Sequence, residues 1–192
     1  MARLQKMAVV GAGSVGAAVA YASTIDRLAD EIALYDINGP RAEAEALDLS
    51  HGLQFVGGGR VRGGADVGLC ADADLVVVTA GATHGPGSTR LDLAATNVGL
   101  VRAALPPLLD VAPDAIYLFV TNPVDVVTYV AQEISGLPHG RVIGSGTVLD
   151  SSRLRHVVAN RLGVSVGSVH AMVVGEHGDS EIVLWSSATV GG

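Results

Sequence analysis

The stretch Val9-Val10-Gly11-Ala12-Gly13-Ser14-Val15-Gly16 decides the fold of this chain, because it carries glycines in the spacing G-x-G-x-x-G. The apolar run before the glycines, Met7–Val10, predicts a strand. The Ala-rich segment that contains the last glycine, Ser14–Ile25, predicts a helix. A glycine triplet between a strand and a helix is the context in which this spacing indicates nucleotide binding.

Each glycine has a separate reason to lack a side chain. Gly11 permits the tight turn, Gly13 lets the backbone approach a pyrophosphate, and Gly16 lets the helix pack on the strand. The unpaired N–H groups at the helix start would face the phosphates. An acid, Asp36, ends the next predicted strand twenty residues after Gly16. It can accept hydrogen bonds from the ribose hydroxyls and repel a 2′-phosphate, which favours NAD over NADP.

Short apolar runs alternate with longer Ala-rich segments along most of the chain. The runs predict further strands at Glu31–Tyr35, Leu75–Thr79, Ala115–Val120 and Arg141–Ile143. The segments between them predict helices at Arg41–Leu53, Thr89–Leu109 and Val124–Ser135. Near-continuous hydrophobicity indicates strands that are covered on both faces. We therefore expect a doubly wound parallel α/β sheet, the Rossmann fold, over residues 1–145.

The last part of the chain has a different pattern. It predicts one helix, Thr147–Leu162, one strand, Val169–Val174, and a final apolar run, Glu181–Ser187. So few elements cannot easily bury their own apolar faces. We interpret residues 146–192 as the N-terminal portion of an incomplete α+β substrate domain.

Composition narrows the classes of partner. The net charge is −7 and no basic stripe is present, which argues against nucleic acid. No apolar run approaches the roughly twenty residues that span a bilayer, so we expect no membrane partner. The N-terminus enters a strand at once and leaves no room for a signal peptide, which favours a cytoplasmic location. The mean hydropathy of +0.44 is high and indicates a covered surface, as in an oligomer.

Several polar residues stand where strands or helices end. Asp150 and Arg153 share one face of a predicted helix, and His177 lies among glycines just after a strand. Arg90 follows a loop rich in Gly, Ser and Thr, and Asn122 ends another strand. Loops at this edge border the ligand crevice of doubly wound sheets. Taken singly, each residue also fits a surface ion pair or an ordinary loop residue.

Taken together, these segments resemble the L-lactate and malate dehydrogenases. The matching segments appear in family order: Gly11–Gly16, Asp36, Pro86–Arg90, Thr121–Asp125, Gly144–Thr147, Leu149–Arg153 and Gly175–Ser180. The similarity spans nearly the whole chain. It implies an NAD-dependent oxidoreductase that acts on a 2-keto or 2-hydroxy acid, with no metal.

The resemblance implies a role for each polar residue. His177 would protonate the substrate carbonyl as hydride arrives, while Asp150 holds the imidazole and favours its cation. Arg153 would clamp the substrate carboxylate, Arg90 would polarise the carbonyl, and Asn122 would hydrogen-bond the substrate oxygen. The cofactor would be bound by Gly11, Gly13, Val15, Gly16, Asp36, Gly81 and Asn122.

Substrate choice depends on His84, six residues before Arg90. Similar lactate dehydrogenases carry glutamine there, and malate dehydrogenases carry arginine. A neutral imidazole would tolerate the methyl group of pyruvate, whereas a protonated one would attract a second carboxylate. A solvent-facing histidine that selects nothing is the third reading. The sequence around Leu149–Arg153 and Glu181–Ser187 favours a bacterial L-lactate dehydrogenase, with malate dehydrogenase as the alternative.

The resemblance also implies partners. Arg155 and His170 match positions that bind fructose 1,6-bisphosphate between subunits of allosteric bacterial lactate dehydrogenases, although both also suit an ordinary surface. Homo-oligomers, dimers or tetramers, are usual in this family. Family members continue well beyond residue 192, so we expect this chain to bind NAD weakly and to catalyse poorly or not at all.

Two other functions compete with this interpretation. A non-catalytic NAD-binding fragment needs the glycines but none of the polar residues at His177, Asp150, Arg153 and Arg90. A short-chain dehydrogenase would need a Tyr-x-x-x-Lys pair, but the only lysine is Lys6. The second alternative therefore fails on composition, and the first stays open.

Overall fold

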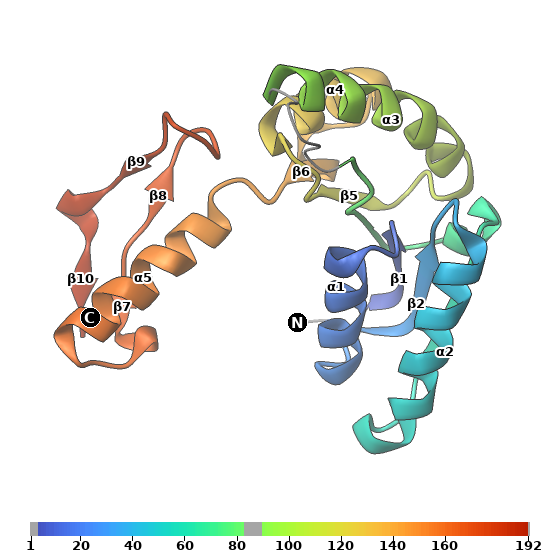
Figure 1. The fold of residues 1–192 in the computed structure, drawn as a ribbon, viewed down its shortest axis with the longest axis horizontal. Helices are drawn as coiled ribbons and strands as arrows, with labels where there is room; N and C mark the ends of the chain where they lie inside the picture. The colour runs from blue at the N-terminus through green and yellow to red at the C-terminus, as the bar shows by residue number, and fades with distance from the viewer. Residues whose placement is uncertain (1–3, 83–89, 192) are drawn as a thin grey trace. The chain divides into compact units, whose positions relative to one another are not determined.

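The computed structural model describes residues 4–82 and 90–191, without the side chain of Arg90. The chain divides into two compact units, residues 1–144 and 145–192 (Figure 1). Within the described residues, no helix is both long enough and apolar enough to cross a membrane.

The first unit is built on a six-stranded parallel sheet with strand order β3-β2-β1-β4-β5-β6. The strands are β1 (Leu4–Val10), β2 (Ala29–Tyr35), β3 (Arg60–Gly64), β4 (Leu75–Val78), β5 (Ile116–Phe119) and β6 (Val142–Gly144). From β1 the chain winds outward to β3, and it then crosses back to β4 and winds the other way. The order confirms the predicted doubly wound sheet, with its switch point between β1 and β4.

Helices cover both faces of this sheet (Figure 1). The helices are α1 (Ser14–Ile25), α2 (Gly39–Val56), α3 (Arg90–Val111) and α4 (Val124–Ser135). Met7 and Val9 pack into the core with α1 and α2, whereas Ala8 and Val10 pack into the core with α3 and α4. Because successive strand residues point to opposite faces, two buried faces require the continuous apolar runs of the sequence.

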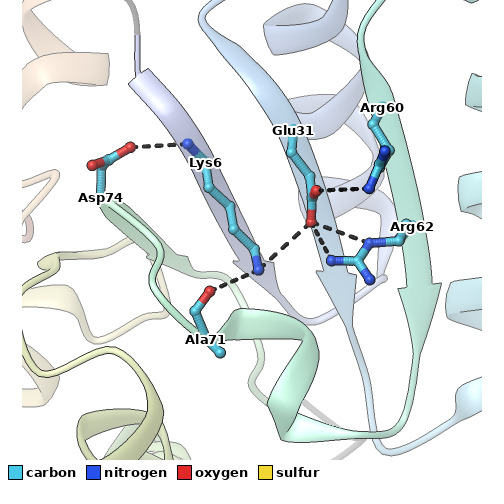
Figure 2. A network of polar contacts seen from close by, with 6 residues as sticks. All are labelled: Lys6, Glu31, Arg60, Arg62, Ala71 and Asp74. Atoms are coloured by element: carbon cyan, nitrogen blue, oxygen red, sulfur yellow. Dashed lines mark hydrogen bonds and ion pairs between the residues drawn. The ribbon is translucent and has the colours of Figure 1, made fainter.

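Strand β3 is an element that the sequence analysis did not predict. Arg60-Val61-Arg62-Gly63-Gly64 has one strongly apolar residue, because an edge strand needs only one buried face. A network of polar contacts connects the arginines of β3 to residues of β2 and β1 (Figure 2). Arg62 Nε donates to Glu31 Oε1 at 3.1 Å, and Lys6 Nζ lies 3.5 Å from the same oxygen.

The second unit contains α5 (Val148–Leu162) and two short antiparallel pairs. Strand β7 (Val169–His170) pairs with β10 (Thr189–Val190), and β8 (Val173–Val174) pairs with β9 (Ile182–Val183). The predicted single strand Val169–Val174 was therefore wrong, because its two ends pair with different partners. The run Glu181–Ser187 likewise forms a two-residue strand and then a 3₁₀ turn at Trp185–Ser187.

Candidate active site

The glycine turn joins β1 to α1 at the carboxyl end of the sheet. Gly11 has φ +100°, and a β-carbon there would lie 2.6 Å from the backbone nitrogen of Ala80. A β-carbon on Gly16 would overlap the carbonyl oxygen of Gly11. At Gly13, by contrast, no described heavy atom lies within 4 Å of the β-carbon position. Two glycines are thus needed for packing, and the third faces open space in front of α1.

The start of α1 suits an anionic group in that space. Gly13 caps the helix, and among the described residues no side chain donates or accepts a capping hydrogen bond there. Val15, in the first turn, is 53 % exposed. The first N–H groups of a helix have no partner within the helix and attract phosphates. The geometry therefore fits the pyrophosphate of a dinucleotide.

Asp36 follows β2 directly and lies beside the glycine turn. Its Oδ2 accepts a hydrogen bond from the backbone nitrogen of Ala12 at 2.7 Å. Its Oδ1 accepts one from the backbone nitrogen of Asn38 at 2.8 Å. A carboxylate has about four lone-pair sites, so each oxygen can accept one further hydrogen bond. The arrangement fits the two ribose hydroxyls of NAD and places negative charge where NADP would carry its 2′-phosphate.

The loops after β4 and β5 carry two more predicted residues, Gly81 and Asn122. Gly81 is exposed, and Asn122 is exposed at the start of the segment that leads into α4. Behind both loops lies Asn97 of α3, which the sequence analysis missed. The side chain of Asn97 accepts from the backbone nitrogen of Ala82 at 2.7 Å and donates to the carbonyl oxygen of Asn122 at 2.6 Å.

Two predicted residues of the substrate site are not described structurally. His84, like the predicted motif Pro86–Thr89, lies outside the described residues. Arg90 is the first residue of α3, and its side chain lies outside them too. The roles of His84 and Arg90 therefore stay predictions from the sequence.

The second unit brings together two predicted catalytic residues, His177 and Asp150, and one predicted substrate-binding residue, Arg153. His177 Nδ1 lies 2.5 Å from Asp150 Oδ2, and Arg153 Nη1 donates to Asp150 Oδ1 at 3.3 Å. The side chain of Asp150 is 10 % exposed, that of His177 is 25 % exposed and that of Arg153 is 64 % exposed. The carboxylate is thus largely buried between a histidine ring and a guanidinium group that reaches into solvent.

Local structure explains how Asp150 meets His177. Two hydroxyls anchor the start of α5 to β8. Thr147 Oγ1 donates to the carbonyl oxygen of Val173 at 2.7 Å, and Ser151 Oγ accepts from the nitrogen of Val173 at 2.9 Å. After β8, Gly175 has φ +96°, a conformation that side chains disfavour, and the chain turns there toward His177. No role was predicted for either hydroxyl, although both flank Asp150 at a helix start and stand in the matching segments Gly144–Thr147 and Leu149–Arg153.

Arg155 and His170, the predicted effector residues, both belong to this unit. Arg155 Nε donates to the carbonyl oxygen of Ala171 at 2.8 Å, which places the guanidinium beside the residue that follows His170. His170 is exposed and pairs with Thr189 between β7 and β10. An arginine guanidinium is a group that binds phosphate.

Glu181 adds a second carboxylate near the histidine. Ligand-type atoms of Asp150, His177 and Glu181 lie within 4.8 Å of one another, a spacing that could hold a metal ion. The Arg153 guanidinium, however, already pairs with Asp150. Its positive charge opposes binding of a cation at the same carboxylate, so the geometry favours proton transfer and anion binding over metal binding.

Fold and fingerprint together define a dinucleotide-binding protein, and comparisons with known proteins make this specific. Residues 5–144 match the family model of the lactate/malate dehydrogenase NAD binding domain. Residues 147–192 match that of the lactate/malate dehydrogenase α/β C-terminal domain. The chain therefore belongs to the lactate/malate dehydrogenase family, as an NAD binding domain followed by part of the C-terminal domain.

Individual proteins that are similar to this chain belong to the same family. The L-lactate dehydrogenase of Bifidobacterium animalis subsp. lactis is 52 % identical over 97 % of this chain and 58 % of its own length. L-lactate dehydrogenase B of Hordeum vulgare is 52 % identical over 99 % of this chain and 55 % of its own length. The crystal structure of the minor L-lactate dehydrogenase of Enterococcus mundtii matches with TM-score 0.93 and 42 % identity, covering 98 % of this chain and 60 % of that one. The chain thus spans less than two thirds of these relatives.

Proposed function

We propose that the full-length protein is a cytoplasmic L-lactate dehydrogenase that reduces pyruvate to L-lactate with NADH. One observation carries the proposal: His177, Asp150 and Arg153 form a connected set, with distances of 2.5 Å and 3.3 Å to the shared carboxylate. Reduction of a 2-keto acid needs a proton donor and an anion clamp, and this set supplies both. A non-catalytic NAD-binding module would need neither.

The proposed mechanism assigns proton transfer to His177. Asp150 engages Nδ1 and fixes the ring, so we assign Nε2 to the substrate carbonyl oxygen. When bound, NADH supplies the hydride that reaches the carbonyl carbon. His177 gives its proton to the oxygen at that step and takes one back in the reverse reaction.

Within the second unit, substrate binding is assigned to Arg153. The exposed guanidinium of Arg153 can donate two parallel hydrogen bonds to the substrate carboxylate. We propose that Arg90 polarises the carbonyl and that Asn122 hydrogen-bonds its oxygen. His84 keeps the role that the sequence predicts for it, the choice between pyruvate and oxaloacetate.

Turnover of the two keto acids tests the assignment. We expect a version extended to the length of its relatives to have a higher kcat/KM for pyruvate than for oxaloacetate. The relatives named above are all L-lactate dehydrogenases, which supports this preference. A clear preference for oxaloacetate would make the protein a malate dehydrogenase, with a protonated His84 attracting the second carboxylate.

We also propose a homo-oligomer, a dimer or a tetramer, with an effector site at Arg155 and His170. The hydrogen bond from Arg155 to the carbonyl group of Ala171, the residue after His170, supports binding of fructose 1,6-bisphosphate. If the idea is right, this compound shifts the pyruvate saturation curve of the extended protein to lower concentration, and substitution of Arg155 by alanine abolishes the shift. An unchanged curve would refute the effector site.

A further inference from the structure

Asn97 is a buried polar side chain that joins two loops at the cofactor edge of the sheet. It is 1 % exposed, on α3. Its Oδ1 accepts from the nitrogen of Ala82 at 2.7 Å, and its Nδ2 donates to the carbonyl oxygen of Asn122 at 2.6 Å. Nδ2 also lies 3.4 Å from the carbonyl oxygen of Ala82.

These two loops begin where pairing between strands stops. Strand β4 ends at Val78 and β5 at Phe119, so Ala82 and Asn122 lie beyond the paired residues. Backbone groups there need another hydrogen-bond partner if they are to hold a fixed position. A carboxamide offers an acceptor and a donor on one short, rigid group. Asn97 therefore fixes the spacing between the loops.

The sheet topology assigns these loops to one half of a dinucleotide site. A doubly wound sheet binds its ligand across the switch point, here between β1 and β4, with one mononucleotide over each half. Asp36, after β2, belongs to the half that holds the adenosine ribose. The loops after β4 and β5 belong to the other half, which receives the nicotinamide riboside.

We propose that Asn97 is a positioning residue for the nicotinamide half of the site, acting through Ala82 and Asn122. The inference rests on NAD binding by this domain. Loss of the carboxamide frees both loops, so Asn122 must be ordered when the ligand binds. The free-energy cost of ordering the loop weakens binding of the whole dinucleotide. It leaves binding of the adenosine diphosphate part unchanged, because that part does not contact these loops.

Two substitutions of Asn97 and one control substitution distinguish a role in positioning the loops from a role in stabilising the fold. Asn97→Leu keeps the approximate size and removes all the side-chain hydrogen bonds to Ala82 and Asn122. Asn97→Asp keeps the acceptor for Ala82 and places an oxygen against the carbonyl of Asn122. The control is Tyr117→Phe, which removes a buried hydroxyl that donates to Leu108 and Ala112 near the other end of α3. Burial raises the pKa of Tyr117 to about 12, so this hydroxyl is a donor at neutral pH.

The experiment titrates the 192-residue chain with NADH and, separately, with ADP. We expect each Asn97 variant to bind NADH about tenfold more weakly, the loss of roughly one hydrogen bond, with unchanged ADP affinity. Tyr117→Phe should lower Tm without changing either affinity. Should Asn97→Leu not fold, Asn97→Asp gives the same comparison.

Other outcomes overturn the inference. Equal loss for NADH and ADP would mean that Asn97 supports only the fold, and no loss for either would mean that it positions nothing. Failure of the native chain to bind NADH would overturn NAD binding by this domain and this inference with it. If the native chain binds NADH and the Asn97 variants bind it with the same affinity, the inference about Asn97 is overturned and NAD binding by the domain stands.

Discussion

At the scale of single residues, Gly13 and Gly16 of the same turn lack a side chain for different physical reasons. Gly16 has no room for a β-carbon because the carbonyl oxygen of Gly11 occupies that position. Gly13 has room, since no described heavy atom lies within 4 Å of the position. Packing therefore explains Gly16, and we propose that ligand approach explains Gly13. A stability measurement and a binding measurement should separate them.

We expect Gly16→Ala to destabilise the first unit by about 1–3 kcal/mol, the usual cost of overpacking. Gly13→Ala should leave Tm within a few degrees and weaken NADH binding about tenfold or more, because the methyl group occupies the approach of the pyrophosphate. Thermal melts and NADH titrations of both variants check this. Equal effects of the two variants on stability would contradict the division of roles.

The charge of Asp36 should determine which dinucleotide binds. Asp36→Ser removes the repulsion of a 2′-phosphate and one acceptor for the ribose, so the ratio of NADPH to NADH affinity should rise about tenfold or more. Asp48→Ser, on the exposed side of α2, is the matched control. An unchanged ratio in Asp36→Ser would mean that this carboxylate does not lie at the ribose.

These residue roles differ in how far the sequence predicts them. The glycine turn and Asp36 depend on local spacing and were predictable. Asn97, Thr147 and Ser151 were not, because asparagine, serine and threonine are common on helices and their partners lie 15 to 26 residues away. Only the folded chain reveals those partners.

At the scale of elements, ion pairs connect the edge strand β3 to the rest of the sheet. Glu31 of β2 contacts Lys6 of β1 and both Arg60 and Arg62 of β3 (Figure 2). Burial alone would raise the pKa of Glu31. The hydrogen bond and positive charge of Arg62, with help from Lys6, instead hold that pKa below its ordinary value of 4.5. The two arginines of β3 made the strand hard to predict from the sequence. The same arginines form the ion pairs that connect it to Glu31 of β2.

Stability of the first unit should therefore depend on pH through Glu31. A carboxyl group with a lowered folded pKa stabilises the fold above its unfolded pKa, and this contribution is lost as pH falls through the folded value. We expect Glu31→Gln to lower stability near neutral pH by about 1 kcal/mol, roughly 2–4 °C in Tm. The difference should vanish in acid.

Melting curves between pH 7 and about pH 3 measure this, since they bracket the titration of carboxyl groups. Glu43→Gln, on the exposed surface of α2, is the control and should follow the native curve. If native and Glu31→Gln proteins keep a constant difference in Tm throughout, Glu31 is not the titrating group.

At the scale of the whole molecule, the second unit leaves apolar side chains exposed. Trp185 is 64 % exposed, Ile182 is 61 % exposed and Met172 is 52 % exposed. Its buried core is small, with Ala159, Val169 and Ala171 at the centre. Relatives of this family are longer than the present chain, and exposed apolar surface favours association.

We therefore expect the 192-residue chain to self-associate and to turn over pyruvate at least about a hundredfold more slowly than the extended protein, since a misplaced catalytic group alone costs that much. Size-exclusion chromatography with light scattering and an NADH oxidation assay measure the two quantities. A monodisperse monomer with full activity would refute the expectation.

Asp150 and His177 form the proposed proton-transfer pair of a lactate dehydrogenase. The most direct test is kcat/KM for pyruvate in the extended protein with Asp150→Asn, together with its affinity for NADH. We expect kcat/KM to fall by about 10²–10⁴-fold, the usual contribution of a positioned acid, while NADH affinity stays unchanged. A fall of only about twofold would contradict the claim, because a catalytic acid contributes far more than that.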